Sequence, residues 1–153
     1  MARATIFVLN GPNLNMLGVR EPHIYGSDTL ADIEAACAER AADLGLDVDF
    51  RQSNLEGQII DWIHEARQGA DGIVLNPAGF THTSVAIHDA LKIADVPIIE
   101  VHLTNTHRRE PWRQHSYISL VATGVIMGLG AQGYLLALDA MARILEAVAD
   151  KAE

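Results

Sequence analysis

Hydrophobic residues along the chain alternate between short continuous runs and longer stretches with helical spacing. Five runs have the length of β-strands, at residues 6–9, 46–50, 72–75, 97–101 and around 125–127. Longer stretches in which apolar residues recur every three or four positions separate most of these runs. The pattern therefore predicts strands and helices in alternation.

Four helices are expected. The first starts at Asp28 or Thr29 and ends at Gly45, residue types that favour a helix start and a left-handed helix end. The second covers residues 59–66 and ends near Gly69, and the third runs from about 84 to 94. The fourth runs from about 132 to 149, with apolar positions at Leu135, Leu138, Met141 and Leu145.

Strict alternation with short connections predicts an α/β fold with a parallel sheet between two helical layers. Right-handed crossovers then give a flavodoxin-like three-layer sandwich, a five-stranded parallel sheet of order 2-1-3-4-5. We expect residues 1–153 to form a single catalytic domain. In this strand order ligands bind beyond the carboxyl ends of the strands, where the loops 10–28, 76–83 and 102–116 would meet. The first loop is long for such a connection and is expected to act as a lid.

The composition of the chain limits the kinds of molecule that it is expected to bind. The net charge of −9 disfavours nucleic acid and anionic membranes, and the sequence predicts a cytoplasmic protein without a signal peptide or a membrane span. The single cysteine, Cys37, excludes an internal disulfide and is expected in the core. Four of the eleven Lys and Arg residues, however, lie in two of these loops: Arg20, Arg108, Arg109 and Arg113. They indicate either a pocket for a small anion or ordinary solvated charge.

The first loop presents an arginine and a tyrosine that could act together. A guanidinium near Tyr25 favours its phenolate, so Arg20 and Tyr25 are a candidate pair for general base catalysis. The alternative is that Tyr25 only packs the loop against the protein.

The fourth strand ends in a second candidate pair. Glu100 and His102 are two residues apart, which places both side chains on one face of the strand, so the carboxylate can orient the imidazole for proton donation. A purely structural pair is the alternative. Asn76 and His82 in the middle loop could bind hydroxyl groups, whereas Thr83 and Ser84 are expected to cap the third helix.

Taken together, these loops closely resemble the type II 3-dehydroquinate dehydratases. The matching segments are LNGPNLNMLGVREPHIYG, NPAGFTHTS, EVHLTN and RREPWRQHSYIS, and the resemblance extends from residue 6 to about residue 138. It implies dehydration of 3-dehydroquinate to 3-dehydroshikimate in the shikimate pathway of aromatic biosynthesis, by anti elimination through an enolate and without a cofactor. It also implies a homododecamer built from trimers.

The resemblance implies roles for single residues as well. Tyr25 would take the proton alpha to the ketone while Arg20 keeps it anionic, and Asn13 would position a water against the enolate oxygen. His102, oriented by Glu100, would protonate the departing hydroxyl. Substrate binding would fall to Asn76, His82, Asp89, Leu103, Thr104, Arg109 and Arg113, with Asp89 contributed across a subunit contact.

Other interpretations remain open from the residues alone. Residues 128–133 match the G-x-G-x-x-G dinucleotide fingerprint, but no further strand follows them, and close packing of a strand on a helix is a better explanation of these glycines. No metal is expected, because the histidines lack a metal-binding motif. A Schiff-base mechanism is disfavoured because Lys92 and Lys151, the only lysines, lie away from the crevice. A flavodoxin-like module that binds a nucleotide or another small molecule without catalysis is the competing class.

Overall fold

Five parallel strands form the centre of the molecule. In the computed structural model, which describes residues 3–19, 21–25 and 27–152 and leaves the side chains of residues 22 and 25 undescribed, the sheet order is β2-β1-β3-β4-β5. The strands are β1 (Ala4–Asn10), β2 (Leu46–Gln52), β3 (Gly72–Asn76), β4 (Ile98–His102) and β5 (Gly124–Met127). All five predicted strands and their order are confirmed.

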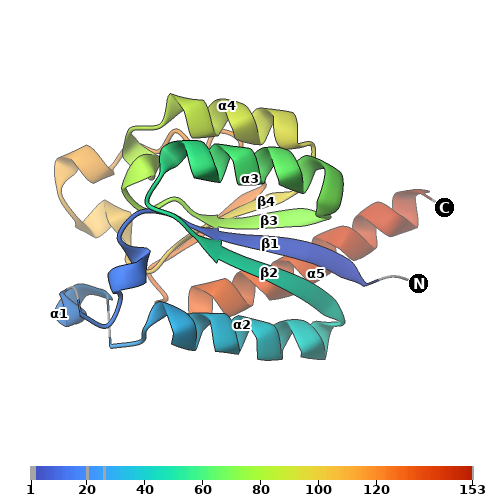
Figure 1. The fold of residues 1–153 in the computed structure, drawn as a ribbon, viewed down its shortest axis with the longest axis horizontal. Helices are drawn as coiled ribbons and strands as arrows, with labels where there is room; N and C mark the ends of the chain where they lie inside the picture. Colours follow the sequence, from blue (N-terminus) through green and yellow to red (C-terminus); the bar gives the residue numbers. More distant parts are fainter. Residues whose placement is uncertain (1–2, 20, 26, 153) are drawn as a thin grey trace.

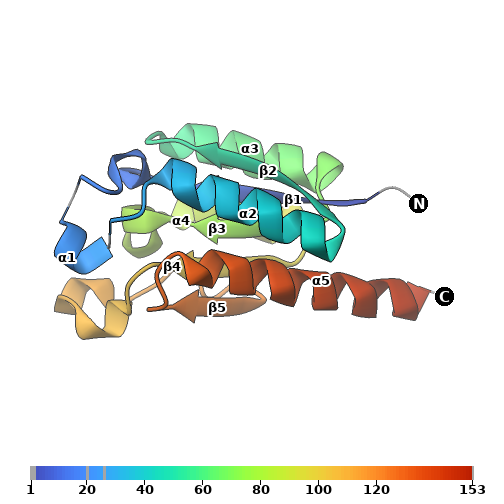
Figure 2. The same cartoon turned by 90° about the horizontal axis from the view of Figure 1, so that it is seen from below.

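Helices cover both faces of this sheet. Helices α2 (Leu30–Leu44) and α5 (Gln132–Ala152) lie on one face, and α3 (Glu56–Gly69) and α4 (Val85–Ala94) lie on the other (Figures 1 and 2). Both described ends of the chain lie at the end of the molecule opposite the strands' carboxyl ends (Figure 1). These four helices confirm the predicted three layers.

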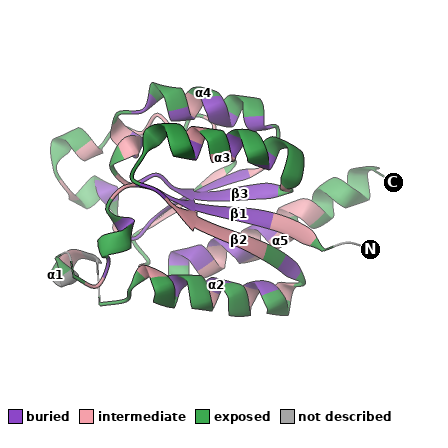
Figure 3. Cartoon of the chain, in the orientation of Figure 1, coloured by how far each residue is buried: buried purple, intermediate pink, exposed green. Residues whose placement is uncertain are grey.

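Strand periodicity divides the core into two clusters. Ile6 and Val8 point toward α2 and α5, whereas Phe7 and Leu9 point toward α3 and α4. The central strands β1, β3 and β4 are therefore largely buried from both sides. The edge strands β2 and β5 are mostly only partly buried, and the outer faces of the helices stay exposed (Figure 3). Cys37 lies in the first cluster, fully buried on α2, as predicted.

The predicted helix ends are confirmed in detail at three positions. The hydroxyl of Thr29 accepts a hydrogen bond from the Asp32 amide while the Asp32 carboxylate accepts one from the Thr29 amide, so a reciprocal capping box begins α2. Gly45 ends α2 with a left-handed φ of 72°. Ser84 caps α4 by accepting a hydrogen bond from the Ile87 amide, whereas Thr83 does not cap this helix.

The carboxyl-terminal part confirms one expectation and needs one correction. Leu138 and Met141 are fully buried on α5, and Leu135 and Leu145 pack against the same cluster while partly buried, in keeping with the predicted apolar positions. Tyr134, which the sequence pattern did not single out, is also fully buried there. Gly128 and Gly130 have φ of 89° and 60°, so turn conformation explains them. Packing of a strand on a helix, the explanation offered from the sequence, does not require these glycines. A Cβ atom at Gly133 would make ordinary 3.5 Å contacts with Ile126 and Val101, and the tighter 3.2 Å contact at Gly128 is with Asn105 in a loop.

Short helical turns fill the loops expected to be irregular. They are α1 (Pro22–Tyr25) and the 3₁₀ turns η1 (Leu14–Met16), η2 (Ala78–His82), η3 (Thr106–Arg108) and η4 (Pro111–Arg113). Both α1 and the η3–η4 segment lie beyond the carboxyl ends of the strands (Figures 1 and 2). The three predicted loops therefore gather at one end of the molecule.

Candidate active site

A cavity of about 290 Å³ opens where these loops meet. Most of the side chains predicted for the site line it: Asn13, Asn76, His82, His102, Leu103, Thr104, Arg109 and Arg113. The cavity lies at the switch point of the strand order, since Asn76 ends β3 and His102 ends β4. The structure thus brings together residues that are far apart in the sequence.

The Glu100–His102 pair forms as predicted. Nε2 of His102 lies 2.5 Å from Oε2 of Glu100, and Glu100 is completely buried. Ser119 donates a hydrogen bond to Oε1 of Glu100 at 2.7 Å, and Ser116 donates one to Oε2 at 3.2 Å. Sequence reasoning missed both serines, although they lie within the RREPWRQHSYIS segment.

These donors decide the charge of Glu100. Burial alone raises the pKa of a carboxyl group, but the hydrogen bonds from His102, Ser119 and Ser116 outweigh it and hold the pKa of Glu100 below its usual value. Glu100 is therefore a carboxylate at neutral pH. Because a carboxylate only accepts hydrogen bonds, Nε2 of His102 carries a proton.

His82 has the opposite electrostatic surroundings. Burial lowers its pKa; the nearby charge of Arg113 and His102 lowers it further, against a hydrogen bond to the carbonyl of His115 that raises it. Nδ1 of His82 lies 2.7 Å from that carbonyl oxygen and must donate to it. At neutral pH the ring is then uncharged, and its Nε2 is left as a hydrogen-bond acceptor.

Two arginines supply positive charge to the cavity. The side chains of Arg109 and Arg113 are 14% and 15% exposed, so they are not ordinary surface charges. Glu110 accepts a hydrogen bond from Nε of Arg113 at 2.6 Å and lies 4.0 Å from Nε of Arg109. Arg109 also donates a long, 3.5 Å hydrogen bond to the hydroxyl of Thr104. The sequence analysis did not predict that Glu110 would face these arginines. Arg108, a third arginine of this loop, lies exposed outside the cavity.

Trp112 forms part of the cavity rim. It is 61% exposed, and Cζ of Arg113 lies 4.1 Å from the centre of its ring. The Trp112 ring also meets the His82 ring edge-on, with 6.3 Å between the centres. The contact between the guanidinium of Arg113 and the face of the Trp112 ring favours one orientation of Arg113.

The start of the first loop is held by side chains from the second strand and the segment after it. Asn13 has a left-handed φ of 71°, and its amide donates to Oδ1 of Asn54 at 2.9 Å. Gln52 donates to the same oxygen at 3.2 Å. Leu14 and Leu17 are buried in the core, so the predicted lid is anchored up to residue 17.

Besides Glu100, which is buried behind His102 and does not itself line the cavity, three predicted residues are not part of it as described. Arg20 and the side chain of Tyr25 lie outside the described residues, and their pairing stays a prediction. Asp89 lies on α4 with a side chain 66% exposed, where it contacts His88 and does not line the cavity of its own chain.

Two absences hold for the residues the structure describes. Within them, no three His, Cys, Asp or Glu side chains are grouped so that they could hold a metal ion. Over the same residues, no helix is both long and apolar enough to cross a membrane.

Fold and site together define a class: a parallel α/β protein whose switch-point pocket combines two arginines with a carboxylate-bound histidine, an arrangement suited to a small anionic ligand. Comparison with known families is more specific. The family model described as Dehydroquinase class II matches residues 4–142. The chain belongs to this family.

Individual relatives agree with this assignment. The chain is 60% identical over 147 residues to a 3-dehydroquinate dehydratase of Streptomyces avermitilis, which covers 95% of this chain and 92% of the relative. It is 57% identical to 3-dehydroquinate dehydratase 2 of Pseudomonas aeruginosa, over 95% and 98% of the two chains. The type II dehydroquinase from Propionibacterium acnes superposes with a TM-score of 0.90 at 47% identity, covering 94% of this chain and 98% of that one.

Proposed function

We propose that the chain catalyses the dehydration of 3-dehydroquinate to 3-dehydroshikimate, a step of the shikimate pathway. The observation that carries the proposal is the pairing of buried Glu100 with His102 at the edge of a cavity that also contains Arg109 and Arg113. A carboxylate substrate needs the cationic side chains, and loss of a hydroxyl as water needs a proton donor beside it.

His102 is the proposed acid. Its Nε2 proton is held by Glu100, so Nδ1 is the ring nitrogen that would hand its proton to the departing hydroxyl. Glu100 stabilises the protonated ring before the transfer and fixes its orientation. The C–O bond then breaks as the electrons of the enolate form the ring double bond, and water leaves.

Tyr25 is the proposed base for the other proton. In this assignment its phenolate, stabilised by Arg20, removes the proton alpha to the ketone and forms the enolate, while Asn13 positions a water against the enolate oxygen. The resemblance of the NGPNLNMLGVREPHIYG segment to the family supports these three roles. No lysine is needed, since the elimination passes through an enolate and not an imine.

Binding of the substrate divides by charge. Arg109 and Arg113 would pair with the carboxylate, which the backbone amides of Leu103 and Thr104 would also bind. His82 and Asn76 would bind hydroxyl groups with uncharged polar atoms. The charged and uncharged binding groups lie on different loops, so the substrate would be held from more than one side.

One spectrophotometric assay tests the reaction. Product formation creates a conjugated enone, so absorbance should rise when the purified chain is added to 3-dehydroquinate, and a chain without this activity would produce no change.

Two variants test the assigned proton transfers. Tyr25→Phe should lower turnover by at least ~100-fold while product binding is nearly intact. His102→Ala should slow elimination far more than it weakens binding, while exchange of the alpha proton continues. Loss of affinity alone would make His102 a binding group.

A further inference from the structure

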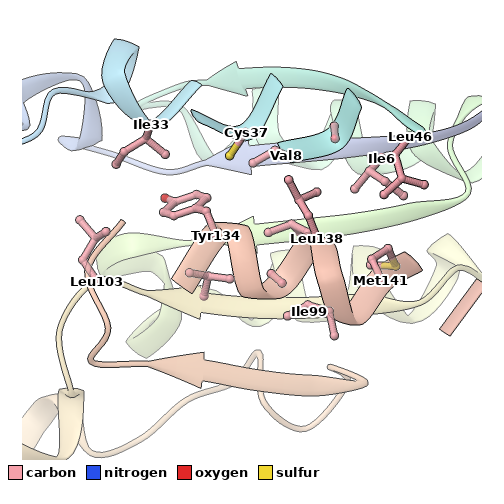
Figure 4. Packing of buried hydrophobic residues seen from close by; sticks show 14 of the residues in the cluster. Ile6, Val8, Ile33, Cys37, Leu46, Ile99, Leu103, Tyr134, Leu138 and Met141 are labelled. Carbon is pink, nitrogen blue, oxygen red and sulfur yellow. The ribbon is translucent and has the colours of Figure 1, made fainter. Parts of the chain in front are cut away.

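The hydroxyl of Tyr134 is buried between two asparagines at the carboxyl ends of neighbouring strands. It donates to Oδ1 of Asn10 at 2.7 Å and accepts from Nδ2 of Asn76 at 2.9 Å. Asn10 ends β1 and Asn76 ends β3, and the two are direct partners in the sheet. Tyr134 reaches them from α5, its ring packed in the core near Ile33 and Cys37 (Figure 4).

The protons in this chain of hydrogen bonds can be arranged in only one way, because each end is fixed by a backbone group. At one end the amide of Ala78 donates to the side chain of Asn76 at 3.1 Å, and an amide N–H can only donate. The atom that receives it must be Oδ1, which turns Nδ2 of Asn76 toward Tyr134. At the other end Asn10 donates to the carbonyl of Arg51 at 3.0 Å, which turns its Oδ1 toward Tyr134.

The hydrogen-bonding role of the tyrosine hydroxyl is then determined. It accepts from Asn76 and must give its own proton to Asn10. Tyr134 is completely buried, and burial raises the pKa of its hydroxyl well above the usual value, so the proton stays in place over the working pH range. Phenylalanine would fit the same apolar surroundings but would leave Nδ2 of Asn76 and Oδ1 of Asn10 without their hydrogen bond to the tyrosine hydroxyl.

We infer that Tyr134 is a positioning residue that, together with the backbone amide of Ala78, holds the side-chain amide of Asn76 so that it presents an N–H donor, and not its oxygen, to the substrate cavity. Asn76 lines that cavity, and its Nδ2 has a second hydrogen beyond the one given to Tyr134. The inference rests on the proposed function, and it assigns the chemistry of one contact: the substrate oxygen bound by Asn76 acts as an acceptor.

This assignment complements that of His82. The Nε2 atom of neutral His82 is an acceptor, so the uncharged part of the cavity contains one donor from Asn76 and one acceptor from His82. A hydroxyl group can pair with either kind of partner, whereas a carboxylate oxygen can pair only with the donor. The pair therefore selects hydroxyl groups over further carboxylates.

Steady-state kinetics on 3-dehydroquinate can test the inference with Tyr134→Phe, Asn76→Ala and the double variant. Asn76 binds a group that does not react, so Tyr134→Phe should raise KM by about 3- to 10-fold with little change in kcat. In the Asn76→Ala background the same substitution should leave KM unchanged, because its only route to the substrate has been removed. Asn10→Ala, which removes the acceptor of the Tyr134 proton, should raise KM in the same way and lose its effect in the same background.

Met141→Leu is the matched control, since Met141 is also fully buried on α5 but has no part in these hydrogen bonds. It should leave KM at the wild-type value. Additive effects of Tyr134→Phe and Asn76→Ala on KM, or an equal rise in KM from Met141→Leu, would overturn the inference and reduce Tyr134 to a core residue. A fall in kcat at constant KM would overturn it too. Wild-type protein that fails to dehydrate 3-dehydroquinate would instead overturn the proposed function, and with it the inference.

Discussion

At the scale of single residues, the site depends on buried polar groups whose partners determine their protonation. Glu100 stays charged because three donors surround it, and His82 stays neutral because it is desolvated and near positive charge. The two groups are therefore prepared for different tasks, one to stabilise a protonated imidazole and one to accept a hydrogen bond. Changes in single partners should be visible in pH dependence.

Ser119→Ala tests whether its hydrogen bond helps to keep Glu100 charged. Loss of its hydrogen bond to Glu100 raises the pKa of the carboxyl group and removes a contact that holds the carboxylate in position against His102. We expect kcat to fall about tenfold, the effect of roughly 1.5 kcal/mol from one charge-assisted hydrogen bond, with KM nearly constant. The decline of kcat on the acid side should begin at higher pH, because Glu100 is then protonated sooner as the pH falls. Ser119→Thr, which keeps the hydroxyl, should restore both, and an unmoved pH profile in Ser119→Ala would argue against the role.

His82 should affect stability as the pH changes. Its pKa in the folded chain lies below the ordinary value of 6.5, so the folded state binds fewer protons at this residue than the unfolded state does. Its contribution is complete above pH 6.5 and is lost as the pH falls through the lower, folded pKa. Urea unfolding between pH 8 and 5 should therefore show a larger loss of stability for wild type than for His82→Gln. Equal losses would contradict the assignment.

At the scale of elements, the loop after β1 and the loop after β3 touch each other by backbone. The amide of Gly11 donates to the carbonyl of Asn76 at 2.8 Å, and a Cβ atom added at Gly11 would lie 2.5 Å from the carbonyl oxygen of Pro77. Only a residue without a side chain allows this approach. Glycine at position 11 therefore determines the distance between two walls of the cavity.

Gly11→Ala should push these loops apart. We expect a loss of about 1–3 kcal/mol in the free energy of unfolding, together with a raised KM, because backbone atoms cannot yield as a flexible side chain can. Gly57→Ala in α3 is the matched control, since an added Cβ there meets nothing within 4 Å. It should leave KM unchanged and stability equal or slightly higher. Equal behaviour of the two variants in chemical denaturation would disprove the close-contact argument.

The regular elements could be predicted from the sequence because their signals are local. Apolar runs located the strands, Thr29 and Gly45 located the ends of α2, and the two-residue spacing placed Glu100 beside His102. The partners of these groups could not be predicted in the same way. Ser119 reaches Glu100, and Tyr134 reaches Asn10, through contacts that no local period encodes.

At the scale of the whole molecule, the position of Asp89 bears on assembly. Its side chain is exposed on α4 and does not line the cavity of its own chain. The role in substrate binding that the family resemblance implies for it would therefore need a neighbouring subunit. The homododecamer built from trimers, which the same resemblance implies, would supply one.

Light scattering on the purified chain should then show a closed assembly of twelve copies. Asp89→Ala should raise KM in that assembly while leaving its mass unchanged. Monomers that turn over 3-dehydroquinate at the full rate would remove Asp89 from the site.

The single thiol in the core can be used to measure how often the folded chain opens locally. Cys37 is fully buried, and burial, with a smaller contribution from Glu34, raises its pKa to about 12, so the native chain offers almost no reactive thiolate. A thiol reagent can attach only when α2 separates from the core. The labelling rate without denaturant should therefore report the free energy of that opening. Because the chain has one cysteine, every adduct results from an opening that exposes Cys37. The labelling rate of each variant can therefore be measured by mass spectrometry without denaturant.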